Sequence, residues 1–309
     1  VARLLTRPVL LGFTAGAALW IASSQVTELL GLTAATGRAP LEVAHALYLA
    51  FTDGSFHLPT AGLGLGLLGL AVGLKKWFPR VPRALVLVVL GTVLVTTLGL
   101  ADFGVSVVGN LPAGLPMWSW PGQALEYAPS LVTAAAVLAL LSFSEGYASG
   151  LTFARRAGDS PPSPNRELLA LGLSNLATGL FSGYPVAGGL SRTAVNAQAG
   201  AVTKRAGLWS AVVVGLALLV LTPLFFFLPR AALAAMILMA LTGFFDIHAW
   251  RNLLRDNRPG AAVFVLTLLA TLGFGITGGL AIGIALGQLS RLLPGNNPVQ
   301  IDSHHPSRA

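Results

Sequence analysis

The chain has 309 residues, of which 54% are hydrophobic and only 10% are charged. A soluble globular protein carries about 25% charged residues to cover its surface. This composition therefore excludes a soluble enzyme, a disordered segment and a nucleic-acid-binding domain, even though the formal net charge is +8. The apolar runs are about 20 residues long, which suits a transmembrane helix and is about twice the length of a barrel strand. The sequence predicts an all-α, multi-pass membrane protein.

The predicted elements follow one another with short connections. The apolar spans expected in chain order are 8–30, 59–74, 83–101, 130–153, 167–182, 207–228, 231–247, 260–277 and 278–293. A further stretch, 190–203, is short and is interrupted by polar residues. A surface helix is expected over 41–51, and 294–309 is a polar tail.

The basic residues predict the orientation of the chain. With ten crossings and a cytoplasmic N-terminus, all but three of the 19 Lys and Arg residues fall on the cytoplasmic side. The exceptions are Arg38, Arg192 and Arg230. Because cytoplasmic loops collect Lys and Arg, we expect a cell inner membrane protein with both chain ends in the cytoplasm.

Three glycines in the second span, Gly64, Gly66 and Gly69, match the pattern G-x-G-x-x-G. That pattern indicates a dinucleotide site only between a strand and a helix of a soluble fold. Within a membrane, small residues let helices approach closely. We therefore expect packing contacts at these glycines.

Glu145 is the most informative acidic residue. It precedes Arg155 by ten residues, or about 15 Å of helix, which is about half the thickness of the hydrocarbon layer. Ser142, Glu145, Ser149 and Thr152 recur at helical spacing and share one face. A charged residue at this depth costs about 2.5–3.5 kcal/mol on insertion scales, so we expect a pathway lining with Glu145 as proton carrier. The alternative is a protonated structural acid that is hydrogen-bonded to a neighbouring helix.

The stretch around 190–203 predicts a helix that begins inside the membrane. Pro185, Gly188 and Gly189 forbid a regular helix just before this stretch, and Ser191 is a suitable N-cap for a helix that begins after it. A helix from Arg192 to about Val202 spans only about 16 Å, too short to cross alone. Its free N–H groups and positive dipole end favour an anion.

Arg192 strengthens the prediction of an anion site, because a cation in the first turn opposes the helix dipole unless an anion lies there. The predicted substrate-binding residues are Gly189, Leu190, Ser191, Arg192 and Thr193, together with Ser142 and Ser149. The alternative is a re-entrant kink in which Arg192 pairs permanently with Glu145.

The five histidines lie outside the centres of the predicted spans, and cysteine is absent. A metal centre or a Ser-His catalytic site inside the membrane is therefore excluded. We expect no enzyme activity, catalytic residue, metal or cofactor.

The run GYPVAGGLSRTAVNAQAGA, residues 183–201, closely resembles the tenth-helix signature of the SulP anion transporters. Residues 143–158 and 165–181 resemble the eighth and ninth helices of that family, and residues 6–25 resemble the fifth. The resemblance covers almost all of 6–293. It implies a fold of fourteen segments in two inverted repeats of seven, a 7+7 arrangement with a core and a gate domain.

Matched in this way, the chain contains segments 5–14 and lacks the first four segments and the STAS domain. The resemblance implies gate segments 5–7 with outer loops over 1–122, and core segments 8–11 over 123–229. Gate segments 12–14 then cover 230–293, and 294–309 is a cytoplasmic tail or linker.

The resemblance and the anion site together imply a secondary active transporter, with proton-coupled symport driven by elevator-like or rocking movement of the core against the gate. The expected partners are a small inorganic anion or dicarboxylate, protons, the lipid bilayer and a second copy in a homodimer. The alternatives are an anion exchanger, a channel, a voltage-driven motor or a nucleobase-type carrier of the same fold.

Overall fold

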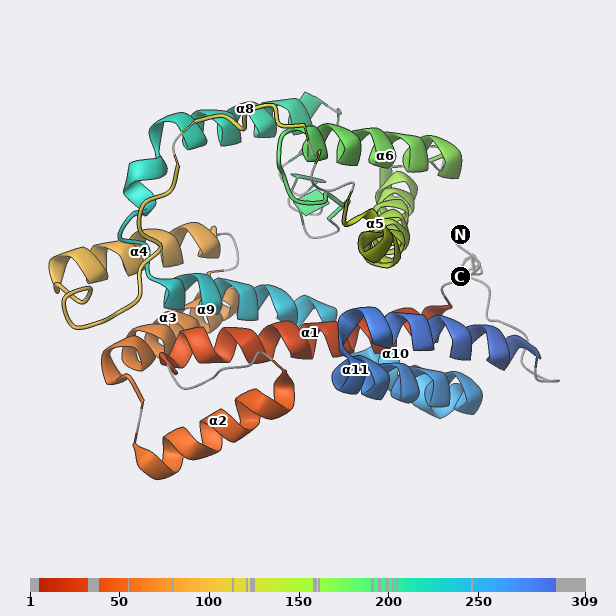
Figure 1. Cartoon of the computed structure of the whole chain (residues 1–309), viewed down its shortest axis with the longest axis horizontal. Helices are drawn as coiled ribbons and strands as arrows, with labels where there is room; N and C mark the ends of the chain where they lie inside the picture. Colours follow the sequence, from red (N-terminus) through yellow and green to blue (C-terminus); the bar gives the residue numbers. More distant parts are fainter. Residues whose placement is uncertain are drawn as a thin grey trace, which may run out of the picture. The chain divides into compact units, whose positions relative to one another are not determined.

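The computed structural model describes residues 6–32, 39–54, 56–78, 81–112, 114–120, 122, 126–157, 160, 162–189, 192–193, 196–197, 200–201, 203, 205–245 and 247–292. The chain forms two compact units. Unit 1 comprises Val1–Gly109 and Phe227–Ala309, and unit 2 comprises Asn110–Phe226. Both units are helical (Figure 1), and each is described by itself.

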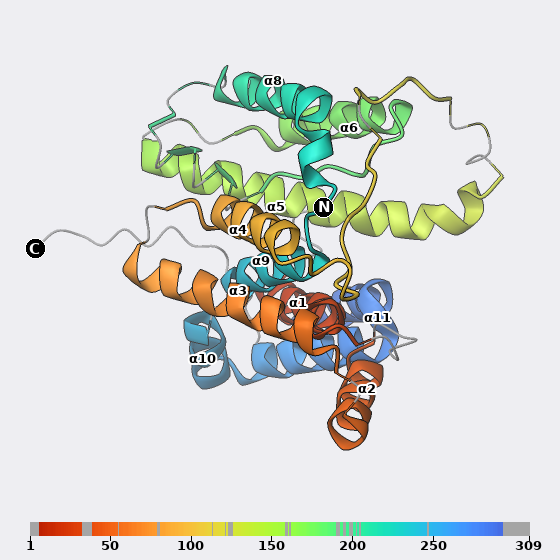
Figure 2. The same ribbon diagram turned by 90° about the vertical axis from the view of Figure 1, so that its left-hand side faces the viewer.

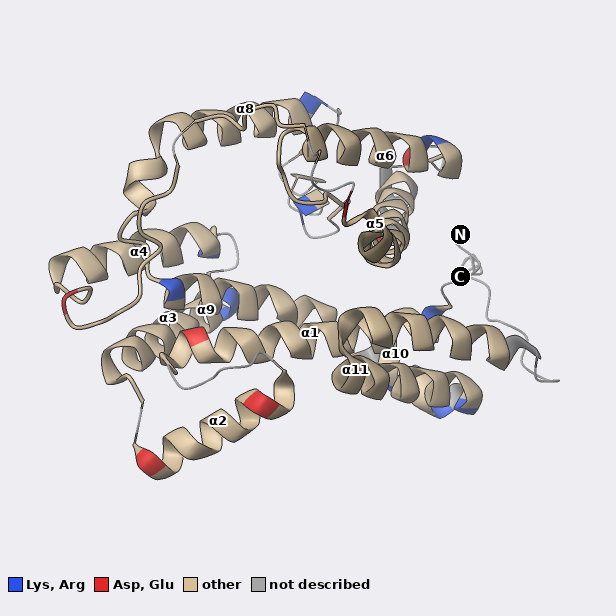
Figure 3. Ribbon diagram, in the orientation of Figure 1, with Lys and Arg blue, Asp and Glu red and all other residues tan. Residues whose placement is uncertain are grey.

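Unit 1 consists of three long apolar helices and four shorter ones within the described residues. The long helices are α1 (Arg7–Leu30), α3 (Leu58–Trp77) and α11 (Arg258–Leu292), and the shorter ones are α2 (Pro40–Asp53), α4 (Arg83–Thr97), α9 (Arg230–Leu241) and α10 (Ile247–Asp256), with a 3-10 turn, η3 (Thr242–Phe244), after α9. The charged residues of α1, α9 and α11 lie in the first or last turn of each helix (Figure 3). The apolar lengths between them can therefore cross a membrane without burying a charge.

Helix α1 packs along α11 through small side chains. A Cβ on Gly16 of α1 would lie 2.6 Å from the Cβ of Thr271 in α11, and a Cβ on Gly283 of α11 would lie 3.1 Å from the Cγ1 of Val9 in α1. Gly12 approaches the backbone of α11 just as closely. Thr267 and Thr271 are fully buried, and their hydroxyls donate to carbonyl oxygens one turn earlier at 2.7 and 2.8 Å. Helices in lipid associate through such close contacts, because lipid matches a Leu side chain in apolarity.

Helix α11 folds back on itself at Gly275. The backbone there has φ 78° and ψ 177°, a conformation that is essentially restricted to glycine. Residues at equal distances from this point meet, so that Gly279 contacts Thr271 and Gly283 contacts Thr267. The last two predicted spans are thus the two arms of one antiparallel hairpin, which lie side by side in blue in Figure 1.

Helix α3 crosses α1 steeply, as Figures 1 and 2 together show. At the crossing, a Cβ on Gly64 would collide with the backbone carbonyl of Leu29. For Gly66 and Gly69, no atom of the described residues lies within 4 Å of the corresponding position. The expected packing contact is therefore confirmed for Gly64, whereas the expectation was wrong for the other two glycines.

A short extended pairing joins the two sequence stretches of unit 1. Val107 pairs antiparallel with Pro229, and the N–H of Val108 donates to the carbonyl of Leu228 at 2.9 Å. The chain segments that enter and leave unit 2 are therefore fastened to each other at its border.

Unit 2 contains α5 (Ala128–Ala157), α6 (Pro164–Leu180), α8 (Arg205–Val220) and a 3-10 turn, η2 (Thr222–Phe225). Residues 183–189 have no regular secondary structure. Beyond them, the described residues 192–193 and 196–197 are helical. They fall in the stretch where the sequence predicts a short helix.

Several predicted spans are confirmed, and others end earlier than predicted. The helices long and apolar enough to cross a membrane, within the described residues, are Arg7–Leu30, Leu58–Trp77, Ala128–Leu151, Arg230–Arg255 and Arg258–Ser290. The predicted C-terminal ends of 83–101, 207–228 and 231–247 were wrong, because the helices stop at Thr97, Val220 and Leu241.

Local residues explain two of these early helix ends. Gly99 has φ 63° after α4, which is typical of a helix C-terminus, and Pro223 follows α8, where it cannot continue a helix. The predicted surface helix over 41–51 is confirmed as α2. Helix α10 was not predicted: it occupies the stretch between the predicted spans 231–247 and 260–277.

Candidate functional site

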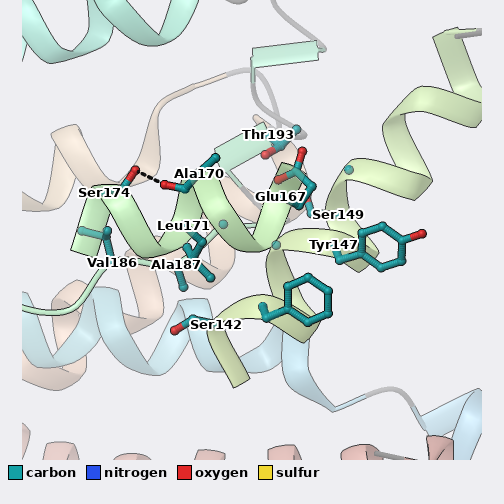
Figure 4. A pocket seen from close by; sticks show the side chains of 14 residues that line it. Ser142, Tyr147, Ser149, Glu167, Ala170, Leu171, Ser174, Val186, Ala187 and Thr193 are labelled. Carbon is teal, nitrogen blue, oxygen red and sulfur yellow. Dashed lines mark hydrogen bonds between the residues drawn. The ribbon is translucent and has the colours of Figure 1, made fainter. Parts of the chain in front are cut away.

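Unit 2 contains a pocket of about 370 Å³ between α5, α6 and the non-helical segment after α6. Figure 4 shows it from close by. The lining residues are Ser142, Phe143, Gly146, Tyr147, Ser149 and Gly150 of α5, Glu167, Ala170, Leu171 and Ser174 of α6, and Val186, Ala187, Gly188 and Thr193 beyond α6. Three parts of the chain therefore converge on one cavity.

Helix α5 presents small and hydroxyl side chains to this pocket. Ser142, Gly146, Ser149 and Gly150 recur every three or four residues and share one helical face. Ser142 and Ser149, both predicted as binding residues, line the pocket and are only 9% and 3% exposed. Glu145 is exposed and is not one of the lining residues.

The non-helical segment is fastened to both helices. The Oδ1 of Asn175 accepts the N–H of Val186, and its Nδ2 donates to the carbonyl of Val186, both at 3.0 Å. On the other side, a Cβ on Gly188 would lie 2.6 Å from the Cα of Gly146 in α5. The segment therefore forms a wall that spans α5 and α6.

The residues after this wall form the start of the predicted short helix. The backbone N–H and the hydroxyl of Thr193 both donate to the carbonyl of Gly189, at 3.0 and 2.9 Å. Arg192 is exposed, and its Nη2 donates to the carbonyl of Ala187 at 3.4 Å. Predicted residues that lie outside the described ones are Leu190, Ser191 and the side chain of Thr152.

The charges around the pocket come from few side chains. Glu167, which was not predicted, is half-buried in the first turn of α6 and lines the pocket. Its spacing from Ala170, Leu171 and Ser174 is helical and was the sequence signal for a shared face. Among the described residues, Arg192 donates to a backbone carbonyl and makes no ion pair with Glu145, contrary to the alternative in which the two pair permanently.

This arrangement suits a small anion better than a reacting substrate. Ser142 and Ser149 line one cavity, and a serine hydroxyl is a hydrogen-bond donor. Thr193 also lines it, but its hydroxyl and its N–H both donate to the carbonyl of Gly189. Arg192, which precedes the lining residue Thr193, carries a positive charge. Within the described part of the chain, no group of three His, Asp or Glu residues is placed to hold a metal.

The comparison with known families decides the class of the protein. The model of the sulfate permease family matches residues 1–267. The chain belongs to the sulfate permease family. Membership of a family of permeases agrees with the prediction of a multi-pass membrane protein that is not an enzyme.

A curated relative of this permease is the Mycobacterium tuberculosis (strain CDC 1551 / Oshkosh) protein named "Probable sulfate transporter MT1781". The two chains are 34% identical over 295 residues, which cover 94% of this chain and 51% of the relative. This permease chain thus spans about half the length of that relative.

Two solved structures show the fold. The structure of SLC26A9 matches with a TM-score of 0.85 at 23% identity, over 93% of this chain and 46% of that one. The transmembrane domain of a cyanobacterium bicarbonate transporter, BicA, matches with a TM-score of 0.72 at 24% identity, over 92% of this chain and 69% of that one. These transmembrane domains have the 7+7 inverted-repeat fold, which confirms the predicted fold class.

Proposed function

We propose that this permease chain forms part of a secondary active transporter of small anions, with the pocket of unit 2 as the substrate site. The observation that carries the proposal is the cavity of about 370 Å³ lined by Ser142, Ser149 and Thr193. Family membership supports it, as do the names of the similar proteins, which refer to sulfate and bicarbonate transport.

Arg192 supplies the positive charge of the proposed site, with Gly189, Leu190, Ser191 and Thr193 around it. Its test is the variant Arg192→Glu, which replaces attraction of an anion by repulsion. We expect sulfate binding by the purified whole protein to weaken at least about tenfold, or about 1.4 kcal/mol. Arg192→Gln should weaken it less, because the hydroxyls and backbone donors remain.

The matched control is Arg205→Glu at the start of α8, which makes the same charge change away from the pocket lining. Its affinity should stay close to that of the parent. Equal affinities of the two Glu variants for sulfate would contradict the proposed site.

Glu145 is the proposed proton carrier, and transport is proton-coupled symport. An ionised carboxylate repels a nearby anion and a protonated one does not, so proton and anion bind cooperatively and reciprocally. In proteoliposomes, Glu145→Gln should keep anion exchange and lose the acceleration by an inward proton gradient. Glu167→Gln is the comparison, because Glu167 lines the pocket. Loss of acceleration in Glu167→Gln alone would move the coupling role to Glu167.

The same uptake assay separates the alternative functions. Counterflow without net accumulation indicates an exchanger, and uptake that never exceeds the electrochemical gradient indicates a channel. Binding of uracil in place of sulfate indicates a nucleobase-type carrier.

In the proposed cycle, unit 1 is the gate and unit 2 is the core that moves against it. The division of the chain into two compact units supports this assignment. Unit 2 covers Asn110–Phe226, whereas the boundaries expected from the resemblance were 1–122, 123–229 and 230–293. The chain has no cysteine, so one spin label can be placed in each unit without background. The distance between the two labels should change on addition of sulfate; an unchanged distance distribution would contradict the movement.

The proposed setting is the cell membrane, with both chain ends in the cytoplasm and two copies in a homodimer. Reporter fusions that are active only in the cytoplasm or only outside test the ends. Native mass spectrometry of the detergent-solubilised protein tests the dimer.

A further inference from the structure

The side chain of Asn175 is fully engaged in hydrogen bonds. Its Nδ2 donates to the carbonyl of Leu171 at 2.9 Å and to the carbonyl of Val186 at 3.0 Å. Its Oδ1 accepts the N–H of Val186 at 3.0 Å. An amide has two N–H donors and one carbonyl oxygen, and all three are in use here.

These bonds fix the orientation of the amide. A flipped amide would place Oδ1 against two carbonyl oxygens and Nδ2 against an N–H, so each contact would become repulsive. No other side chain type fits equally well. Aspartate lacks the donors, and glutamine is one methylene longer. The pattern thus requires asparagine at position 175.

The partner of Asn175 is the backbone of the pocket wall. The segment around Val186 has no helix or strand to pair with its N–H and carbonyl groups. Asn175 pairs with both groups of Val186 as a neighbouring strand would. Val186, Ala187 and Gly188 line the pocket, and Gly188 rests on Gly146 of α5. The wall therefore has one anchor on each helix.

We propose that Asn175 is a positioning residue for the anion site: it holds the backbone of Val186 to α6 and thereby sets the position of the pocket wall and of the residues that begin the short helix. Asn175 itself lies outside the pocket lining. The inference rests on the proposed function only in its final step, from wall position to anion affinity.

The absence of cysteine from the chain allows a direct test of wall position. Val186→Cys places one thiol on the wall and leaves the backbone bonds to Asn175 in place, because these use only the main chain. The rate at which a charged methanethiosulfonate labels this thiol is measured in the otherwise unchanged whole protein, then in Asn175→Ala and Asn175→Asp. A second reporter, Ser163→Cys, lies on the exposed residue before α6 and controls for general loosening.

With Asn175→Ala, both hydrogen bonds to the wall are lost. We expect labelling at position 186 to change by about tenfold, with labelling at position 163 unchanged. Asn175→Asp should not restore the parent rate, because the donors are still missing. The matched control is Thr178→Val, one turn further along α6, whose hydroxyl donates only to the Ser174 carbonyl of its own helix. It should label like the parent.

Unchanged labelling in Asn175→Ala would overturn the proposal, and so would an equal change in Thr178→Val. Sulfate is then added as the probe. It should slow labelling at position 186 in the parent, and the half-protecting concentration should rise about tenfold in Asn175→Ala. If sulfate protects both forms equally, Asn175 positions the wall without affecting the anion site, which also overturns the proposal. If sulfate never protects the parent, the proposed anion site fails while the labelling result still decides the role of Asn175.

Discussion

The two units differ in how closely their helices pack. In unit 1, Val9, Ala15 and Leu280 are 0% exposed, and glycines bring helix backbones close together. In unit 2, α6 and α8 have no buried residue among their described ones, and two of the few buried side chains of α5 are Ser142 and Ser149. Apolar content alone therefore does not identify the helices that pack tightly. The positions of small residues identify these helices.

The largest effect is expected where unit 1 is tightest. Gly12→Leu puts a large side chain where the backbone of α11 already lies, and we expect the free energy of unfolding to fall by about 3 kcal/mol or the fold to fail. Gly66→Leu is the control, because no atom of the described residues lies within 4 Å of a Cβ there. Thermal unfolding of both variants in detergent measures the difference. Similar unfolding temperatures would remove the distinction between packed and open glycines.

The hairpin turn offers the next effect in size. Gly275→Ala forces a Cβ into a backbone conformation with φ 78°, and we expect a loss of about 2 kcal/mol. Gly273→Ala changes a glycine with open space around it and no positive φ, so alanine there should be neutral or slightly stabilising. The same unfolding measurement compares the two. A stable Gly275→Ala variant would mean that the turn does not need glycine.

In unit 2, we expect an added side chain to lower the affinity for sulfate more clearly than it lowers stability. Gly188→Ala places a Cβ 2.6 Å from the Cα of Gly146, but sparse packing lets the wall move away. We expect a loss of about 1 kcal/mol in stability together with a clear loss of sulfate affinity. Gly172→Ala on α6 meets open space and should change neither quantity. A stability loss as large as that of Gly12→Leu would show that unit 2 is packed as tightly as unit 1.

The smallest effect is expected for a buried hydroxyl that serves only its own helix. Thr267→Val removes a bond to the carbonyl of Val263, which the helix backbone already satisfies, so stability should change by no more than about 0.5 kcal/mol. Trp20→Phe removes a bond between helices, from the indole N–H to the carbonyl of Thr271 at 2.8 Å, and should cost about 1 kcal/mol. Reversal of this order would indicate that the hydroxyl of Thr267 has a further role.

The sequence predicts the crossings well and their ends poorly. Long apolar runs identify α1, α3 and α5 directly, because lipid requires about 20 such residues. The turn of the α11 hairpin was harder to place, because Gly273, Gly275 and Gly278 are all candidates and only tertiary contacts select one. Helix α10 was missed although Ile247, Trp250 and Leu254 recur at helical spacing. Its ten residues are too short for a search based on membrane spans.

The candidate site was predictable where one helix or one motif defines it. Ser142 and Ser149 follow from spacing along α5, and Thr193 follows from the start of the short helix. Asn175 could not be predicted, because its importance depends on a contact with Val186, eleven residues away across a turn of irregular backbone. Such side-chain to backbone pairing leaves no periodic signal.

The bend at Gly275 also determines which side of the membrane the chain reaches next. No charged residue lies between Arg258 and Arg291, so no charge marks a turn within the apolar stretch of 33 residues, Arg258–Ser290. An unbroken helix of that length, about 50 Å, would cross once and emerge opposite its start. The hairpin instead returns to the side it left, so one glycine sets the parity of the crossings. The side of the membrane on which α11 ends therefore depends on a single backbone conformation.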